Sequence, residues 1–303
     1  MTERIVELAE GPVRLHVRNG QLIVSREGQP EVSTPLAEIA VLLLSQPHAQ
    51  ITQAVLSGIA LAGGTVVICD SHFLPAGMLL PLQSHFVQTE RFAQQAELGQ
   101  PLRKRLWQEI VRAKIRAQGR LLQELRGDNA GLPALVARVG SGDPENVEAQ
   151  AARRYWPVVF ANPAFHRARD GPPPNNLLNY GYTVLRAAVS RALCGAGLHP
   201  SFGLKHSNRY DTFSLASDLM EPFRPLVDRA VALWVRDHDP TLPVGREAKS
   251  FLIGAIQSRY QIEGEARTLP DTLGGTSAAL ARAIGGEQER FAVPEVGPPC
   301  PGD

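Results

Sequence analysis

Four side chains of this sequence could bind a divalent metal ion and act on a phosphate group. They are one histidine and three carboxylates: Glu148, His206, Asp218 and Glu221. Hard oxygen donors combined with one imidazole suit Mg²⁺ or Mn²⁺ better than a structural zinc site. Such an ion can polarise a phosphodiester and activate a water or a sugar hydroxyl. These residue types therefore allow metal-dependent phosphodiester chemistry.

Each of these residues also has an ordinary explanation. A glutamate in the first turn of a helix, as expected for Glu148, commonly interacts with the helix dipole. A lone histidine is often only exposed or hydrogen-bonded, and the Asp-x-x-Glu spacing of Asp218 and Glu221 is common, although it puts both carboxylates on one helical face. Pro222 disfavours the α region for the residue before it, so we expect a kink at Glu221.

Basic residues are concentrated in one part of a nearly neutral chain. The formal net charge is +1, from 31 Lys and Arg against 30 Asp and Glu, but eight basic and only two acidic residues lie between Arg103 and Arg126. Local charge of one sign lets a neutral protein bind phosphate backbones, although a solvated helix face is the simpler reading. The candidate phosphate contacts are Arg105, Arg112, Arg116, Arg120, Arg153, Arg154, Lys205, Arg209 and Arg224.

The elements that must position these residues are predicted to be of two kinds. Residues 1–84 are β-rich: alternating runs at 13–17 and 22–24 flank Asn19-Gly20, a strong hairpin signal, and 39–44 and 66–69 are typical of buried strands. A single helix is expected at 51–61. Residues 85–293 have helical spacing, with helices expected at 102–125, 146–156, 175–196 and 210–236. The fold class is therefore α+β, with a small β-rich domain before a larger helical one.

The two ends of the chain and its cysteines suggest a location. The tail 294–303 holds four prolines and two glycines and is expected to be disordered. No apolar run approaches the roughly 20 residues needed to cross a bilayer, and the start lacks a secretory pattern. Three widely spaced cysteines suit a reducing compartment. We expect a cytoplasmic protein without a membrane association.

A long stretch around the acidic pair resembles a known family. Residues 197–228, which include the run LASDLMEPFRP at 215–225, closely resemble the core of the CRISPR-associated adaptation integrase, the larger protein of the universal spacer-acquisition pair. Glu148 followed by AARRYW at 151–156 resembles the glutamate helix of that family. NNLLNYGY at 175–182 resembles its Asn-rich helix start. The basic helix at 107–122 looks like that of the branch paired with single-effector systems.

This resemblance implies a specific activity. Glu148, His206 and Glu221 match the family's metal-ligand positions, and Asp218 matches a nearby acidic position needed for activity. The family has an N-terminal β domain for dimerisation and partner contacts and a helical catalytic domain that binds metal and DNA. It forms homodimers that assemble with a small ferredoxin-like adaptation partner on double-stranded DNA. The implied reaction is transesterification, in which a 3′-hydroxyl of the incoming fragment attacks a phosphodiester at the edge of the repeat.

Two other functions fit the same residues. A stand-alone metal-dependent nuclease or branched-DNA resolvase would use the same ligands with water as nucleophile, since water and a sugar hydroxyl attack the same phosphorus. A non-catalytic DNA-binding scaffold would use the carboxylates only for stability. The sequence predicts the integrase and leaves these two as alternatives.

Overall fold

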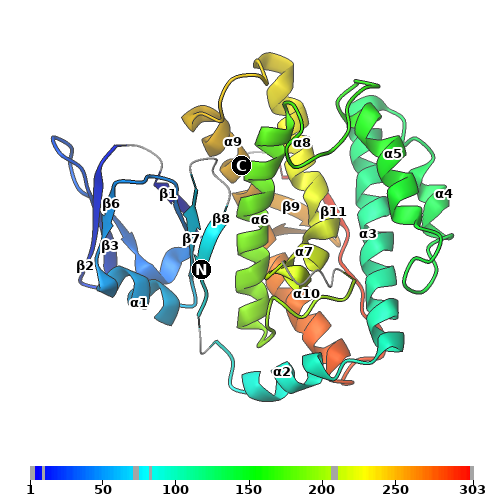
Figure 1. Cartoon of the computed structure of the whole chain (residues 1–303), viewed down its shortest axis with the longest axis horizontal. Coiled ribbons are helices and arrows are strands. Elements are labelled where there is room, and N and C mark those ends of the chain that lie inside the picture. Colours follow the sequence, from blue (N-terminus) through cyan, green and yellow to red (C-terminus); the bar gives the residue numbers. More distant parts are fainter. Residues whose placement is uncertain (1–3, 9–10, 71–74, 82–83, 206–210, 301–303) are drawn as a thin grey trace.

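The structure is a computed structural model that describes residues 4–8, 11–70, 75–81, 84–205 and 211–300. It has two parts, as Figure 1 shows: a β-rich N-terminal part and a larger, mainly helical part. The predicted fold class, a small β-rich region followed by a larger helical one, is confirmed.

The N-terminal part packs two four-stranded sheets. One has the order β1-β5-β7-β8 and the other β4-β3-β2-β6. Helix α1 follows β6 and supplies Val55 and Ile59 to the apolar core of this part. The two segments predicted to be buried strands, 39–44 and 66–69, lie in β5 and β7. All six residues of β5 are buried. The elements are β1 (Arg4–Leu8), β2 (Val13–Arg18), β3 (Gln21–Ser25), β4 (Val32–Pro35), η1 (Leu36–Glu38), β5 (Ile39–Leu44), β6 (Ala49–Ile51), α1 (Gln53–Leu61), β7 (Thr65–Cys69) and β8 (Pro75–Leu79).

The predicted hairpin is the pair β2 and β3. Arg18 pairs with Gln21 in an antiparallel register, so only Asn19 and Gly20 form the loop. Both loop residues have positive φ, 51° and 71°, as a two-residue turn of this kind requires. The predicted helix at 51–61 begins two residues later than expected, because Ile51 ends strand β6 and pairs with Leu15.

The helical part surrounds one long buried helix, α6, of 21 residues. It packs against α7, α8, α9 and α10, and α3 lies beyond α7 and α8 with α4 and α5 on its outer side (Figure 1). The elements are α2 (Gln88–Ala96), α3 (Gln100–Arg126), α4 (Leu132–Val136), α5 (Val147–Val159), α6 (Asn175–Gly195), α7 (Ser214–Met220), η2 (Glu221–Phe223), α8 (Arg224–Asp237), α9 (Arg246–Gln257), β9 (Arg259–Ile262), β10 (Glu265–Thr268), α10 (Leu269–Ile284) and β11 (Val296–Pro299).

Helix α3 carries most of the concentrated basic charge. It runs for 27 residues, roughly 40 Å at 1.5 Å per residue, and ends where Gly127 adopts a left-handed conformation with φ 68°. Its buried residues include Ile110, Ile115 and Leu122, which face the core of the helical part.

Among the described residues, no helix is both long and apolar enough to span a lipid bilayer.

The C-terminal tail differs from its predicted disorder. Strand β11 pairs antiparallel with β9, and β9 pairs with β10 on its other side, so the three form a small sheet inside the helical part. The prolines did not prevent this pairing because β11 lies at the edge of the sheet, where a missing backbone N–H is tolerated. The tail is also held by an ion pair of 2.5 Å between Glu295 and Arg120 of α3. Within residues 294–300, the expectation of disorder is therefore corrected.

Candidate active site

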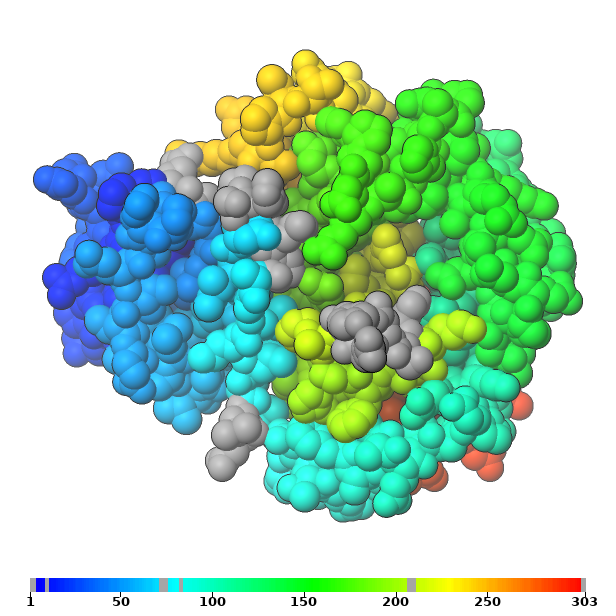
Figure 2. Space-filling model, in the orientation of Figure 1, coloured from blue at the N-terminus to red at the C-terminus, as the bar shows by residue number. Residues whose placement is uncertain are grey.

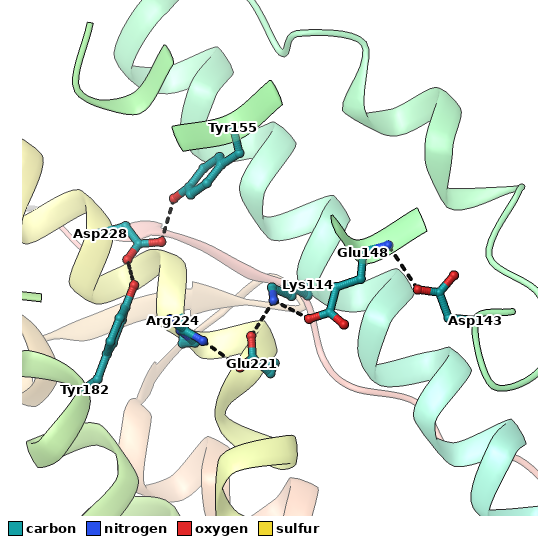
Figure 3. Close-up of polar contacts among 8 residues, drawn as sticks. All are labelled: Lys114, Asp143, Glu148, Tyr155, Tyr182, Glu221, Arg224 and Asp228. Carbon is teal, nitrogen blue, oxygen red and sulfur yellow. Dashed lines mark hydrogen bonds and ion pairs between the residues drawn. The ribbon is translucent and has the colours of Figure 1, made fainter. Parts of the chain in front are cut away.

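Two of the predicted metal ligands converge on a single lysine. Glu148 at the start of α5 and Glu221 in η2 are 73 positions apart in the chain, yet Lys114 Nζ lies 2.6 Å from Glu148 Oε1 and 2.6 Å from Glu221 Oε2. Figure 3 shows both carboxylates pointing toward this nitrogen, Glu148 from α5 and Glu221 from the turn that precedes α8. The folded chain therefore forms a position at which two carboxylates share one cation.

This cluster is shielded from water. The exposed fractions of the side chains are 11% for Lys114, 22% for Glu148 and 8% for Glu221. Burial alone would lower the pKa of Lys114, but Glu221 and Glu148 outweigh it and raise that pKa above its usual value. Burial would raise the pKa of Glu221, yet Arg224 and Lys114 bring it down to about 2. Glu221 is thus ionised at neutral pH, as a metal ligand must be.

Glu221 owes its position to an interrupted helix. Helix α7 ends at Met220, residues 221–223 form the 3-10 turn η2, and α8 begins at Arg224. The break lies where Pro222 predicts it, but Glu221 itself keeps right-handed helical angles of φ −53° and ψ −44°. The helix is thus interrupted at the expected kink, although Glu221 itself stays within the α region. The interruption also lets Arg224 donate to Glu221 Oε1 at 2.7 Å.

Asp143 fixes the start of the helix that carries Glu148. Its Oδ1 accepts the amide of Val147 at 2.8 Å and its Oδ2 accepts the amide of Glu148 itself at 3.0 Å. These amides belong to the first turn of α5, which has no partners within the helix. Asp143 is only 6% exposed and has a φ of 51°. Sequence reasoning missed this residue, because the capping rule points to Asn146 directly before the helix, and Asp143 lies three residues earlier.

Asp218, the third predicted carboxylate, binds backbone amides. It is fully buried, and its Oδ2 accepts the backbone amides of Leu204 at 2.6 Å and Lys205 at 3.0 Å. It thereby anchors the segment that leads directly into His206. His206 and Arg209, two of the predicted site residues, lie outside the described residues. The three-residue spacing of Asp218 and Glu221 thus sends the two carboxylates to different partners.

The donors that are present fit a divalent cation. Both glutamates offer carboxylate oxygens, which Mg²⁺ and Mn²⁺ prefer, and Glu148 Oε1 and Glu221 Oε2 both face the position that Lys114 Nζ occupies. Within the described ranges, no three His, Cys, Asp or Glu side chains are grouped as metal ligands. The described part therefore contributes two converging carboxylates of the predicted set, Glu148 and Glu221.

A second buried acid, Asp228, connects helices next to the site. Asp228 of α8 accepts hydrogen bonds from the hydroxyls of Tyr155 (2.7 Å) and Tyr182, which come from α5 and α6 (Figure 3). Burial raises the pKa of Asp228 to about 6, although both hydroxyls and Arg224 act against it. The Arg224 guanidinium stacks over the Tyr182 ring at 4.1 Å from its centroid. This arrangement connects the helices that carry Glu148 and Glu221.

The predicted DNA contacts fall into three groups. Arg105, Arg153, Arg154 and Lys205 are exposed, as phosphate contacts should be, and Arg116 is half-buried. Arg112 pairs with Glu109 at 2.9 Å and bonds to the Val139 carbonyl, and Arg120 pairs with Glu295. Arg224 pairs with Glu221 inside the site. The arginine face of α3 is therefore partly used within the protein, so it is not one continuous free surface.

Lys114 is a second residue of the site that sequence reasoning did not single out. It lies four residues after Ile110, within the apolar stripe of α3, and is 9% exposed. A lysine at a core-facing position is rarely buried unless it is paired. The position of Lys114 in this stripe therefore indicates that its charge is paired. Only the tertiary structure shows that the partners are Glu148 and Glu221.

Comparison with known proteins identifies the family. Residues 8–241 match the family CRISPR associated protein Cas1. CRISPR-associated endonuclease Cas1 of Neisseria meningitidis serogroup C is 39% identical over 233 residues, covering 76% of this chain and 75% of that protein. A protein named CRISPR-associated endonuclease Cas1 2 of Pyrobaculum aerophilum is 29% identical over 241 residues, covering 75% of this chain and 81% of its own length.

Solved structures share the fold. A casposase bound to an integration product superposes with a TM-score of 0.80 at 18% identity, covering 96% of this chain and 93% of that one. A Cas1 protein from Thermotoga maritima gives a TM-score of 0.76 at 18% identity and covers 94% and 97%. The resemblance inferred from residues 197–228 is thus confirmed over most of the chain: the protein belongs to the Cas1 family of CRISPR-associated proteins.

Proposed function

We propose that this chain is the metal-dependent integrase of CRISPR spacer acquisition, which inserts short DNA fragments into the repeat array. The observation that supports it most is the convergence of Glu148 and Glu221, from distant segments of a Cas1-family chain, on one cation position. Lys114 and Arg224 lie beside that position and provide positive charge for a phosphodiester substrate.

In this proposal Glu148, His206 and Glu221 hold Mg²⁺ or Mn²⁺. A bound divalent ion supplies charge for the non-bridging oxygens of the phosphodiester and lowers the pKa of the attacking hydroxyl. Arg224, 2.7 Å from Glu221, and Lys114 add positive charge close to the reacting phosphate. Asp218 acts as a positioning residue, because it binds the two amides that precede His206.

The proposed partners are double-stranded DNA, a second copy of the chain and a small ferredoxin-like adaptation protein. Similar folds have been solved as a Cas1–DNA complex from a relative and as a Cas6-RT-Cas1–Cas2 complex, which supports binding to DNA and assembly with a second protein. The proposed location is the cytoplasm, where an array-modifying enzyme would meet its DNA.

The decisive experiment is an insertion assay. Purified protein, its adaptation partner, a short duplex and repeat DNA are incubated with Mn²⁺, Mg²⁺ or EDTA, and joined strands are resolved on a gel. We expect joining only with a divalent ion. Glu148→Gln, Glu221→Gln and His206→Ala should each lower it by at least about a hundredfold, the usual loss on removing a group that stabilises transition-state charge.

Glu145→Gln is the matched control, because Glu145 is an exposed acid three residues before Glu148 whose partner is Arg138. Its insertion rate should equal that of the wild type. Full insertion by His206→Ala would remove the proposed mechanism.

A nuclease or branched-DNA resolvase is the second candidate, favoured by relatives that carry the name endonuclease. It predicts metal-dependent cleavage without strand joining even when the partner protein is present. A non-catalytic scaffold predicts that Glu221→Ala leaves both joining and cleavage intact and alters only stability.

A further inference from the structure

The lysine between the two candidate ligands comes from a third element. Lys114 lies on α3, Glu148 on α5 and Glu221 in η2, and Lys114 Nζ is 2.6 Å from one oxygen of each acid (Figure 3). An ammonium group has three donors, so it can hold two carboxylates at the same time. Arg224 forms its ion pair with Glu221. Lys114 is therefore the group through which Glu148 and Glu221 are connected.

A divalent ion on the same oxygens would repel this ammonium group. Mg²⁺ binds oxygen ligands at about 2.1 Å, so an ion on Glu148 Oε1 or Glu221 Oε2 would lie within about 4.7 Å of Lys114 Nζ. Two cations repel each other strongly at this range where water is largely excluded, and the Lys114 side chain is only 11% exposed. The ion and the ammonium group therefore compete for the same two carboxylates.

The charge balance of the cluster favours exchange over addition. Two carboxylates, Glu148 and Glu221, are paired with two cations, Lys114 and Arg224, so the four side chains together are neutral. Adding a divalent ion to all four would leave two unbalanced positive charges in a largely buried place, which is unfavourable. If the lysine leaves, one positive charge remains, and the single negative charge of a phosphodiester balances it.

The ammonium group of Lys114 can leave the cluster without a change in the backbone. It lies at the end of a flexible four-carbon chain. The cluster reaches solvent at Glu148, whose side chain is 22% exposed. Figure 2 shows this face of the molecule hollowed, with yellow segments between green ones. A displaced ammonium group therefore reaches water and stays close to the two glutamates.

We propose that Lys114 is a place-holding cation, which keeps Glu148 and Glu221 together and leaves their shared position when a divalent metal ion binds there. This inference rests on the proposed function, which puts Mg²⁺ or Mn²⁺ on the two glutamates. Without a cation between them, two buried carboxylates would repel each other. Lys114 is a positioning residue in this role, and its released ammonium group becomes available to a phosphate.

Lysine labelling follows the position of Lys114 in the wild-type protein. The protein is treated with an amine-reactive N-hydroxysuccinimide ester in EDTA or in saturating Mn²⁺, and peptide mass spectrometry gives the labelled fraction of each lysine. Two other lysines are the controls: Lys104 is exposed, and Lys249, paired with Glu7, is 3% exposed. We expect Mn²⁺ to raise the labelling of Lys114 several-fold. Lys104 should be labelled, and Lys249 protected, under both conditions.

Two methionine variants separate this role from a purely structural ion pair. Lys114→Met and Lys249→Met each remove a buried lysine, so both should melt below the wild type in EDTA. Only Lys114→Met should bind Mn²⁺ more tightly, by about tenfold or more, because its metal-free form lacks the charged hydrogen bonds that the ion must break. Electron paramagnetic resonance measures this affinity. Saturating Mn²⁺ should also recover more of the lost melting temperature in Lys114→Met than in Lys249→Met.

Either of two results would overturn the place-holding role. One is a Lys114 that stays as protected in saturating Mn²⁺ as it is in EDTA. The other is an Mn²⁺ affinity of Lys114→Met that equals or falls below that of the wild type, with a loss of melting temperature that Mn²⁺ does not reduce. Lys114 would then be an ion pair that serves stability alone.

The two proposals can fail separately. Release of Lys114 by Mn²⁺, in a protein that joins no strands with any divalent ion, would support the place-holding role and reject the integrase. Metal-dependent strand joining by a protein whose Lys114 stays protected would do the reverse. A wild-type protein that binds no Mn²⁺ would reject both.

Discussion

At the scale of single residues, the ionisable groups of the site are buried, and neighbouring charges or hydroxyls offset the cost of burying each of them. Glu221 is almost fully buried yet remains ionised, because Lys114 and Arg224 each lie within 2.7 Å of one of its oxygens. Asp228 is equally buried, but its nearest partners are two neutral tyrosine hydroxyls. The two acids therefore shift in opposite directions: the pKa of Glu221 falls to about 2 and that of Asp228 rises to about 6. Partner charge, more than depth, decides which of the two can serve as a metal ligand.

The raised pKa of Asp228 predicts a pH effect on stability. Between its usual value of 3.8 and about 6, the folded protein binds this proton more tightly than the unfolded chain does. The contribution of Asp228 to the free energy of unfolding should therefore fall as pH rises through this window, by about 3 kcal/mol in total. Urea unfolding at pH 4 to 7 measures it, with Asp228→Asn as the comparison. The fall from pH 4 to 6 should be smaller in Asp228→Asn, and identical curves for the two proteins would contradict the assignment.

At the scale of elements, the ends of helices place the two candidate ligands. Glu148 lies in the first turn of α5 and Glu221 lies in η2, between α7 and α8. At both positions some backbone N–H or C=O groups have no hydrogen-bond partner within the helix, so side chains must supply one. Asp143 does this for α5 by binding two amides, one of which belongs to Glu148. Any loosening of that cap displaces the carboxylate that the helix carries.

Asp143 is therefore expected to matter for both stability and metal binding. Asp143→Ala should lower the free energy of unfolding by about 1–2 kcal/mol, because it removes a cap and places alanine at a positive φ. Asp143→Asn should lose less, since asparagine tolerates that backbone and keeps one acceptor. Chemical denaturation gives the stability, and Mn²⁺ titration followed by electron paramagnetic resonance gives the affinity. Wild-type stability and Mn²⁺ affinity in Asp143→Ala would show that the cap has no such role.

At the scale of the whole molecule, a buried ion pair joins the two parts of the chain. Glu7 of β1 lies 3.1 Å from Lys249 of α9, with exposed fractions of 10% and 3%, and Ser45, which directly follows β5, also donates to Glu7. Lys249 lies over the ring of Tyr180 in α6, 5.5 Å from its centroid. The sheet β1-β5-β7-β8 is thereby attached to the helices that surround α6. This ion pair is one of several contacts between the N-terminal part and the helical part.

A double-mutant cycle on this pair tests the attachment. Glu7→Gln and Lys249→Met should each lower the free energy of unfolding by about 3 kcal/mol, because each leaves a buried charge without its partner. The double variant should lose clearly less than the sum of the two, and urea unfolding measures all three. Strict additivity would show that the pair does not couple the parts. The exposed pair Arg18 and Glu31 of the N-terminal part is the control, with an expected coupling below about 1 kcal/mol.

The sequence alone determined the order and type of the main elements and the chemical nature of the site. Hairpin residues such as Asn19 and Gly20, the stripe of α3 and the break at Pro222 are local features, set by backbone sterics and by periodic burial. The run at 215–225 also identified the family, because that many residues in one order seldom recur by chance.

Only the tertiary structure decided which of these residues meet. Lys114 lies in an apolar stripe, yet its two partners are distant in sequence, and Asp218 binds the backbone amides of Leu204 and Lys205. The tail became a strand because β9 offered it a free edge. Contacts of this kind depend on how helices pack across long loops, and no local pattern of residues encodes that packing.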